Sequence, residues 1–423
     1  MHKLFPTSPF FDFETIRILG TTVYGGADAA EVLEAVGHIK PNDPVSWEHA
    51  WGTQASWAEG LADEARKHGD RNAARRGYLR AANYTRAKGY IPTTGAVEGP
   101  CGRTPRALPT AERVSELFRK AISLMDGPVL TLSIPYEDEF HLPAYLYLPP
   151  ASCRIPGRDK IPILVNCGGA DSCQEELFFL NPAEGPALGY AVITFDGPGQ
   201  GMMLRKHELA MRPDWEAVTG CVIDHLVQFS RQNPQYDLDT DSICVSGASM
   251  GGYFALRGAI DSRVKACVSI DPFYDMWDFG TAHVSPLFIS AWTQGWIGQG
   301  LIDRVLSVAK RMSFQLNWEI SVTGTFFGLA SPAAILLHMK HFTLAAAQKE
   351  EDTSFLSHVT CPVLVSGAGA SLYMDCPDRD KEIWVPNSEG RGSLQAKMGA
   401  LALCNQQTYQ FLDRALGIIR KPL

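Results

Sequence analysis

Short apolar runs that end in glycine or aspartate constrain the fold of this chain most. They recur through its second half as "KIPILVNCGG", "GYAVITFDGPGQG", "SICVSGASMGG", "VKACVSIDPF" and "CPVLVSGAGA". Runs of this kind are typical of strands that are buried on both faces of a parallel sheet. Helical segments separate them, for example "WEAVTGCVIDHLVQFSRQ". The alternation predicts an α/β protein with a doubly wound sheet, whose ligands bind at the carboxyl ends of the strands.

Helix-rich sequence lies before the predicted sheet and interrupts it. Residues 1–122 are predicted to form an N-terminal helical module, in which one long helix ends near Gly69 and the next begins at Asp70, a suitable N-cap. A predicted hairpin, "VLTLSIPYE" with "HLPAYLYLPP", opens the first part of the α/β core over residues 123–278. The N-terminal helices either cover the ligand site or form a homodimer contact, and the sequence leaves both open.

A cap is predicted to follow the sixth strand. Residues 279–357 are aromatic and mostly helical, and residues 358–423 then complete the α/β core. The alternative is a helical subdomain with structural duties only. In either case we expect the cap aromatics to line a large apolar pocket: Trp292, Trp296, Phe326 and Phe327.

Composition narrows the possible partners. The 423-residue chain has a formal net charge of −8, which argues against nucleic acid or an anionic membrane as its partner. It has no apolar run of about 18 residues, and its N-terminus does not resemble a signal peptide. Ten cysteines form no Cys-x-x-Cys pair and no cluster with metal spacing. We therefore expect free thiols, no metal and a cytoplasmic location.

The stretch "ICVSGASMGGYFALRGA" predicts a nucleophile. Ser249 stands between two glycines, after a predicted strand and before a predicted helix. A strand that turns sharply into a helix forces the central serine into a strained conformation, and its hydroxyl then projects above the sheet. The N–H of Met250 would point at the oxygen of an attacked carbonyl. The alternative is a chance glycine–serine turn.

A second backbone donor is expected in the loop after the third strand, "VNCGGADSCQEE". Gly168 and Gly169 let the backbone approach a ligand, and the N–H of Ala170 or Asp171 can donate. Two such donors form an oxyanion hole, which stabilises negative charge on a carbonyl oxygen. The alternatives are a plain Gly-Gly turn and, for the Asp171 carboxylate, stabilisation of that turn.

Five blocks in this order carry a family resemblance: "GGADSCQEELFF", "FDGPGQG", "RPDWEAV", "SGASMGGYFALRGA" and "GSLQAKMGALALCNQQTYQFLD". Over about residues 45 to 418 the chain resembles the α/β-hydrolases of fungal secondary metabolism, which accompany polyketide synthases and polyketide–peptide hybrid synthetases. The resemblance implies an α/β-hydrolase fold, a cytosolic enzyme without cofactor, and Ser249 in the nucleophile position. It also implies a small-molecule polyketide-type substrate, with carbon–carbon bond hydrolysis or ring closure as the reaction.

The remaining members of a catalytic triad are missing from their usual places. Related hydrolases carry the acid after the seventh strand, where this chain has Ala370. They carry the histidine before the last helix, where this chain has Gly392 and Ser393. No histidine follows His358 in the sequence. The histidine that serves as the general base in related hydrolases is therefore absent from its usual position in this chain.

Replacements for the acid and the base are available elsewhere. His283, soon after the sixth strand, is the best candidate for a displaced base, ahead of His338, His341 and His358. Asp271, at the end of the sixth strand, is the candidate acid, or a weak base if burial raises its pKa. Its alternative is an N-cap for the following turn.

Three functions remain open at this point. The first is carbonyl chemistry at the oxyanion hole, either an aldol or Knoevenagel-type ring closure or the hydrolysis of a C–C or ester bond. An oxyanion hole polarises a ketone or aldehyde without a triad, so ring closure fits a missing histidine. A conventional serine esterase or peptidase with a displaced histidine is the second. The third is a catalytically dead protein that binds an apolar ligand. The strained elbow argues against this third function, because backbone strain without a function is costly to retain.

Overall fold

The computed structural model describes residues 1–91, 106–282, 284–345, 355–367 and 381–422. His283 and Ala370 lie outside the described residues. The chain forms one sheet with the strand order β1-β2-β4-β3-β5-β6-β7-β8. The strands are β1 Val129–Tyr136, β2 Phe140–Tyr147, β3 Ile161–Cys167, β4 Ala191–Phe195, β5 Leu238–Ala248, β6 Val264–Ile270, β7 Val363–Ser366 and β8 Lys381–Trp384.

The sheet is mostly parallel, as predicted. Only β2 pairs antiparallel, with β1 on one side and β4 on the other, whereas every pair from β4 to β8 is parallel. Because the strand order reverses on either side of β3, the carboxyl ends of β3, β5 and β6 lie next to one another. The α/β-hydrolase fold expected from the sequence is therefore confirmed.

Strands β3 and β4 are buried along their whole length. Neighbouring residues of one strand face different layers: Leu164 packs in a cluster with Cys404 of α14, and Val165 packs in a cluster with Val222 of α7. A strand covered on both faces has no exposed position, so its sequence is a continuous apolar run. The helices nearest the sheet are α6 Gly201–His207, α7 Trp215–Gln232, α8 Met250–Gly258 and α14 Leu401–Ala415.

Strand β8 was not among the strands expected from the apolar runs. Its burial pattern is intermediate at both ends and exposed in the middle, and it lies at the edge of the sheet. An exposed edge strand needs no apolar run, which explains why "KEIW" does not attract attention in the sequence.

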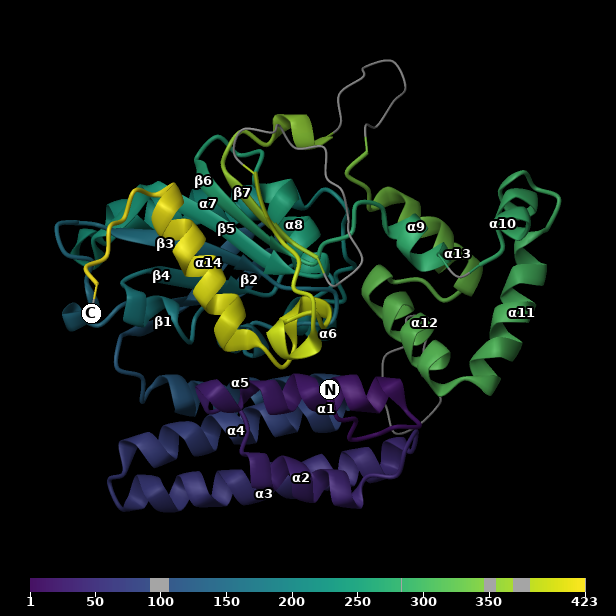
Figure 1. Cartoon of the computed structure of the whole chain (residues 1–423), viewed down its shortest axis with the longest axis horizontal. Coiled ribbons are helices and arrows are strands. Elements are labelled where there is room, and N and C mark those ends of the chain that lie inside the picture. Colours follow the sequence, from purple (N-terminus) through teal and green to yellow (C-terminus); the bar gives the residue numbers. More distant parts are fainter. Residues whose placement is uncertain (92–105, 283, 346–354, 368–380, 423) are drawn as a thin grey trace.

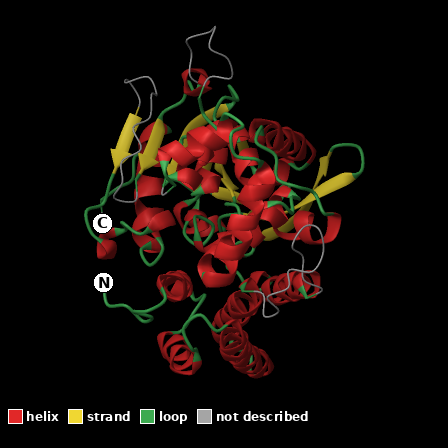
Figure 2. Cartoon of the chain, turned by 90° about the vertical axis from the view of Figure 1, so that its right-hand side faces the viewer, coloured by secondary structure: helices red, strands yellow, loops and turns green. Residues whose placement is uncertain are grey.

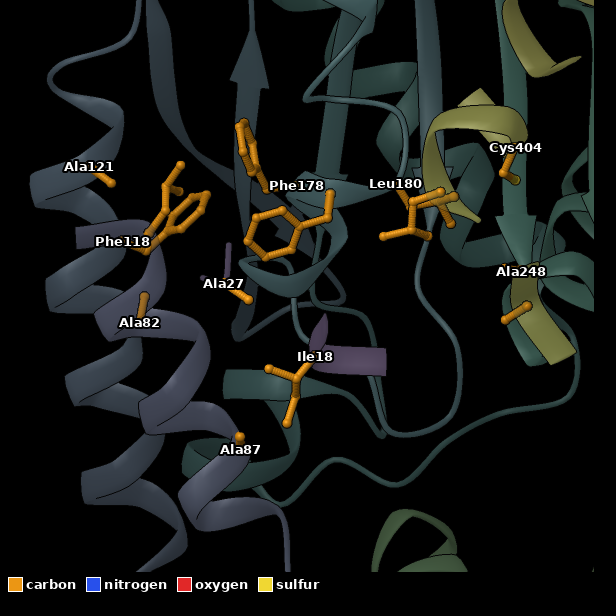
Figure 3. Packing of buried hydrophobic residues seen from close by; sticks show 14 of the residues in the cluster. Ile18, Ala27, Ala82, Ala87, Phe118, Ala121, Phe178, Leu180, Ala248 and Cys404 are labelled. Atoms are coloured by element: carbon orange, nitrogen blue, oxygen red, sulfur yellow. The ribbon is translucent and has the colours of Figure 1, made fainter. Parts of the chain in front are cut away.

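The N-terminal helices pack together below the sheet in Figure 1, and Figure 2 shows the same arrangement from the side. The predicted N-cap is confirmed, since the Asp70 carboxylate accepts a 2.9 Å hydrogen bond from the N–H of Ala73. Phe118 and Phe178 lie between these helices and the sheet, with ring centroids 5.8 Å apart (Figure 3). The helices are α1 Pro9–Leu19, α2 Ala29–His38, α3 Pro44–Lys67, α4 Arg71–Tyr90 and α5 Ala107–Ile122.

A second helical group follows β6 and forms the arm at the right of Figure 1. It comprises α9 Met276–Thr281, α10 Pro286–Thr293, α11 Gln299–Met312, α12 Phe314–Phe327 and α13 Pro332–His338. Within the described residues no single helix is long and apolar enough to cross a membrane, although α12 and the segment Pro332–His341, bent by 63°, pass that test together on length and composition.

The expectation that four cap aromatics line one pocket is right for Phe326 and wrong for the other three. Phe326 lines the large cavity described below. Phe327 instead stacks on Phe342 at 5.0 Å, and Trp292 packs against Trp277. Trp296 is 81% exposed. Helical periodicity in the sequence shows which face of a helix is apolar, but tertiary packing decides which surface each side chain of that face contacts.

Candidate active site

Ser249 forms the predicted elbow between β5 and α8. Its backbone has φ 57° and ψ −123°, a strained combination for a residue with a side chain. The N–H of Ser249 donates to the carbonyl oxygen of Ile270 at 2.8 Å, which ties the elbow to β6. A Cβ at Gly247 would lie 2.1 Å from the Gly251 oxygen, and one at Gly251 would lie 2.4 Å from the Cys167 oxygen. Both glycines of the motif are therefore required by close backbone approach.

The loop after β3 lies directly against the start of α8. A Cβ at Gly169 would meet the carbonyl oxygen of Ala248 at 3.4 Å. The Gln200 amide donates to the oxygens of both Gly168 and Gly169, at 2.8 Å each, and so fixes the direction of the loop. The N–H of Gly169 donates to Ser172 Oγ at 3.1 Å. Gly169 is thereby engaged within the loop rather than facing a ligand.

Two backbone amides beside Ser249 have no acceptor among the residues that the structure describes. Within the described residues, the N–H groups of Ala170 and Met250 donate no hydrogen bond, and Ser249 Oγ forms none either. Ala170 lines the same cavity as Ser249, and Met250 is the first residue of α8. Unpaired N–H groups at the start of a helix are favourable positions for negative charge.

A cavity of about 470 Å³ opens in front of Ser249. The loop after β3 contributes Gly169, Ala170 and Asp171 to its wall, and the segment before α14 contributes Gln395 and Ala396. Helices α1 and α12 supply much of the remaining wall. Its apolar lining includes Phe10, Phe13, Phe179, Trp318, Val322 and Phe326. A cavity of this size and lining suits a largely apolar small molecule.

Asp171 lies at the cavity, but its carboxylate is engaged by the N-terminal helices. Arg17 Nη1 donates to Asp171 Oδ2 at 2.7 Å, and the Tyr90 hydroxyl donates to the same oxygen. Burial raises the pKa of Asp171, but the charge of Arg17 and the hydrogen bonds from Arg17 and Tyr90 outweigh it and lower the pKa to about 2. The carboxylate links α1 and α4 to the loop after β3.

Asp271 is paired with Lys397, a residue for which the sequence predicts no role in the site. Lys397 Nζ donates to Asp271 Oδ1 at 2.7 Å and to the Gly367 carbonyl oxygen at 3.1 Å. The side chains of Lys397 and Asp271 are 0% and 1% exposed. The Ser366 hydroxyl also donates to Asp271 Oδ1, at 2.8 Å. Asp271 is therefore the acid of a buried ion pair and is not among the residues that line the cavity.

Lys397 stands in the segment before α14, where related hydrolases carry their histidine. Lys397 lies in the block "GSLQAKMGALALC", but the sequence does not mark it as a site residue. An ammonium group has no acceptor with which to take up a proton, so a lysine there is not expected to replace a histidine base. Both Ala396 and Lys397 adopt left-handed backbone conformations, with φ of 54° and 57°. The pair with Asp271 supplies the interaction that holds this strained segment in place.

No histidine lines the cavity within the described residues. His338 and His341 contact each other, and His338 also packs against Phe327. Burial, followed by the charge of His341, lowers the pKa of His338. His358 precedes β7, in contact with Phe355. His283, the preferred candidate for a displaced base, stays a prediction because it lies outside the described residues.

The sheet order and the elbow together define an α/β-hydrolase. A family model described as "Alpha/beta hydrolase family" matches residues 163–388, and the chain belongs to this family. The resemblance drawn from the five sequence blocks is confirmed at this level, and the chain is an enzyme of the α/β-hydrolase family.

The relatives are fungal. The chain is 66% identical to "Hydrolyase ccsE" of Aspergillus clavatus, with 100% of each chain covered. It is 62% identical to "Hydrolase pyiE" of Pyricularia grisea, covering 100% of this chain and 99% of that one. The crystal structure of 2,6-dihydroxy-pseudo-oxynicotine hydrolase has a TM-score of 0.67 at 19% identity, with 96% and 98% of the two chains covered, which shows a common fold.

Proposed function

We propose that this enzyme acts in fungal secondary metabolism on a carbonyl group of a polyketide or polyketide–amino-acid intermediate, and that it closes a ring by an aldol or Knoevenagel-type reaction. The observation that carries the proposal is the combination of Ser249, two amides at Ala170 and Met250 that donate no hydrogen bond within the described residues, and a buried lysine in the segment before α14. The place in secondary metabolism rests on the family resemblance.

The amides supply the chemistry. When a carbon nucleophile attacks a ketone or aldehyde, the carbonyl oxygen becomes negatively charged, and donors aimed at that oxygen lower the barrier by several kcal/mol. Ser249 Oγ then donates a third hydrogen bond to the oxygen instead of attacking the carbon. The apolar wall of the 470 Å³ cavity holds a long reduced chain in a folded conformation, which brings its two ends together.

The buried lysine argues against hydrolysis by Ser249. A serine nucleophile needs an acceptor for its proton, and a Lys397 ammonium bonded to Asp271 and Gly367 offers none. A site with an oxyanion hole and no such base activates a carbonyl without forming an acyl-enzyme. Without a base to activate water, the site also protects a reactive product from hydrolysis.

The test is turnover of Ser249→Ala with a linear polyketide–amino-acid aldehyde, with the product identified by mass. We expect closure to fall about 10²- to 10³-fold, the usual loss when one oxyanion donor is removed. The matched control is Ser123→Ala, which removes an exposed hydroxyl that donates to the Lys120 carbonyl oxygen outside the cavity and should leave closure unchanged. Undiminished closure by Ser249→Ala would exclude the proposed site.

A fluorophosphonate probe separates this proposal from a conventional serine esterase. An activated serine reacts rapidly with the probe, whereas an unactivated hydroxyl does not. We expect no labelling at Ser249 under conditions in which the enzyme closes the ring. Rapid labelling that is lost in His283→Ala would favour the esterase. A protein that binds the substrate tightly and gives no product would be a ligand-binding protein.

A further inference from the structure

The part of the cavity wall that α1 forms includes a buried carboxyl group, that of Glu14. Glu14 is 4% exposed and lines the cavity. Its Oε2 accepts a single long hydrogen bond, 3.5 Å from Arg17 Nη1. Within the described residues its other oxygen, Oε1, has no partner. A buried carboxyl group that lines a cavity, with one oxygen that has no partner among the described residues, needs an explanation.

Glu14 differs from the neighbouring carboxylates in how closely it is paired with a positive charge. Arg17 forms short pairs with Asp171 at 2.7 Å and with Glu176 at 2.6 Å. Arg86 lies 3.2 Å from Glu176. Among the described residues, two guanidinium groups therefore face three carboxylates, and Asp171 and Glu176 hold the short contacts. Glu14 has only the long 3.5 Å contact with Arg17, which it shares with the other two.

We propose that Glu14 is the proton-accepting catalytic residue of this cavity, and that its substrates carry an acidic carbon between two carbonyl groups. This deepens the proposed ring closure and rests on it. The carboxylate removes the proton from that carbon, while the second reacting carbonyl lies at Ser249. A carbon between two carbonyls is far more acidic than the α-carbon of an isolated ketone, so it is better matched to a carboxylate base.

The step balances within the enzyme and its substrate. The C–H bond breaks, its proton passes to a Glu14 oxygen, and its electron pair becomes the enolate. The enolate carbon forms the new C–C bond to the second carbonyl carbon, whose oxygen becomes an alkoxide facing the amides of Ala170 and Met250. Glu14 returns the proton to that oxygen, which gives the aldol alcohol. In the Knoevenagel case Glu14 then removes the remaining proton of the same carbon and passes it to the hydroxyl, which leaves as water while the C=C bond forms. No oxidant or co-reactant is needed.

Burial suits Glu14 to this role. It raises the pKa of Glu14 to about 7, since desolvation outweighs the charge of Arg17, and the charge of Asp171 adds to the rise. Arg86 lowers this pKa and Glu176 raises it, so the groups on α1, α4 and the loop after β3 all contribute. A general base is most effective when its pKa lies near the working pH.

The experiment measures hydrogen–deuterium exchange at C2 of a 3-oxododecanoyl amide in D₂O, above the uncatalysed rate. We expect Glu14→Gln to lower exchange by at least ~100-fold and Glu14→Asp to retain part of it. The matched control is Glu64→Gln, an exposed carboxylate on α3 that does not line the cavity, and it should leave exchange unchanged. In the parent enzyme, exchange should rise with pH with a midpoint near 7, as Glu14 loses its proton.

Ser249→Ala separates this proposal from the one on which it rests. We expect that variant to keep exchange and lose ring closure, because deprotonation at Glu14 does not require the hydroxyl. Exchange at the parent rate in Glu14→Gln would overturn the role of Glu14 and leave the Ser249 site intact. No exchange by the parent enzyme would overturn the proposed substrate class. Glu14→Gln should unfold at the same or higher urea concentration than the parent at pH 8, since it removes a buried charge.

Discussion

Lys397 and Asp271 illustrate how single residues shape this site. Both are buried, and Asp271 Oδ2 has no hydrogen-bond partner within the described residues. Lys397 Nζ also lies 5.0 Å from the centre of the Trp384 ring. The pair connects the end of β6 to the segment before α14, and Gln395 in that segment donates to the Asp271 carbonyl oxygen at 3.2 Å. We infer that the pair positions this part of the cavity wall.

Replacement of Lys397 by methionine should lower the free energy of unfolding by about 3–5 kcal/mol, because it leaves the Asp271 carboxylate buried without a cation. Urea denaturation measures the change. The double variant Lys397→Met/Asp271→Leu is the control, and it should recover most of the loss since no uncompensated charge remains. A double variant as unstable as the single one would show that packing of the lysine stem, and not its charge, is what matters.

At the scale of elements, the junction of β3, β5 and α8 depends on backbones that approach without side chains. Gly251, in the first turn of α8, faces the Cys167 oxygen and the Gly168 backbone. The loop that carries Ala170 therefore rests on α8, the helix that begins at Met250. This contact sets the distance between the two amides of the proposed oxyanion hole.

Gly251→Ala should shift that loop and lower ring closure by about 10²-fold, near the effect of losing one oxyanion donor. Crowding of the added methyl group against the neighbouring backbone should also lower the free energy of unfolding by about 1–3 kcal/mol. Gly60→Ala in α3 is the matched control, since a Cβ there meets nothing within 4 Å. It should stabilise the protein by about 0.5–1 kcal/mol and leave closure unchanged. Equal activities of the two variants would contradict this picture.

At the scale of the whole molecule, the N-terminal helices are part of the candidate site. Phe10, Phe13 and Glu14 of α1 line the cavity together with residues of the sheet loops and of α12. Arg17 joins these parts, because it bonds Glu176 through two nitrogens, at 2.6 and 2.7 Å, besides its contact with Asp171. The helices therefore cover the pocket, one of the two roles left open by the sequence.

Arg17→Ala should cost about 3–5 kcal/mol in urea denaturation, because it removes one partner of a buried ion-pair network. Arg71→Ala is the control. It breaks a pair with Asp126 in which the side chains are 49% and 62% exposed, so the loss should stay below about 1 kcal/mol. Similar losses in the two variants would show that Arg17 does not join the N-terminal helices to the core.

The sequence predicts the sheet and the elbow because both depend on local patterns. A strand buried on both faces must be apolar throughout, and a nucleophile elbow must have glycines where backbones meet, as at Gly247 and Gly251. Asp70 was recognisable as an N-cap for the same reason, since a cap bonds within one helical turn. These features need no knowledge of distant parts of the chain.

Only the tertiary structure decided what surrounds Ser249. The partner of Asp271 is a lysine 126 positions further along the chain, and Asp171 is held by Arg17, which is 154 positions away. Glu14 reaches the cavity because α1 packs against the loop after β3. Ion pairs and cavity walls between distant segments leave no periodic signal in the sequence, since their residue types are fixed by burial and by the charge of a neighbour that folding brings near.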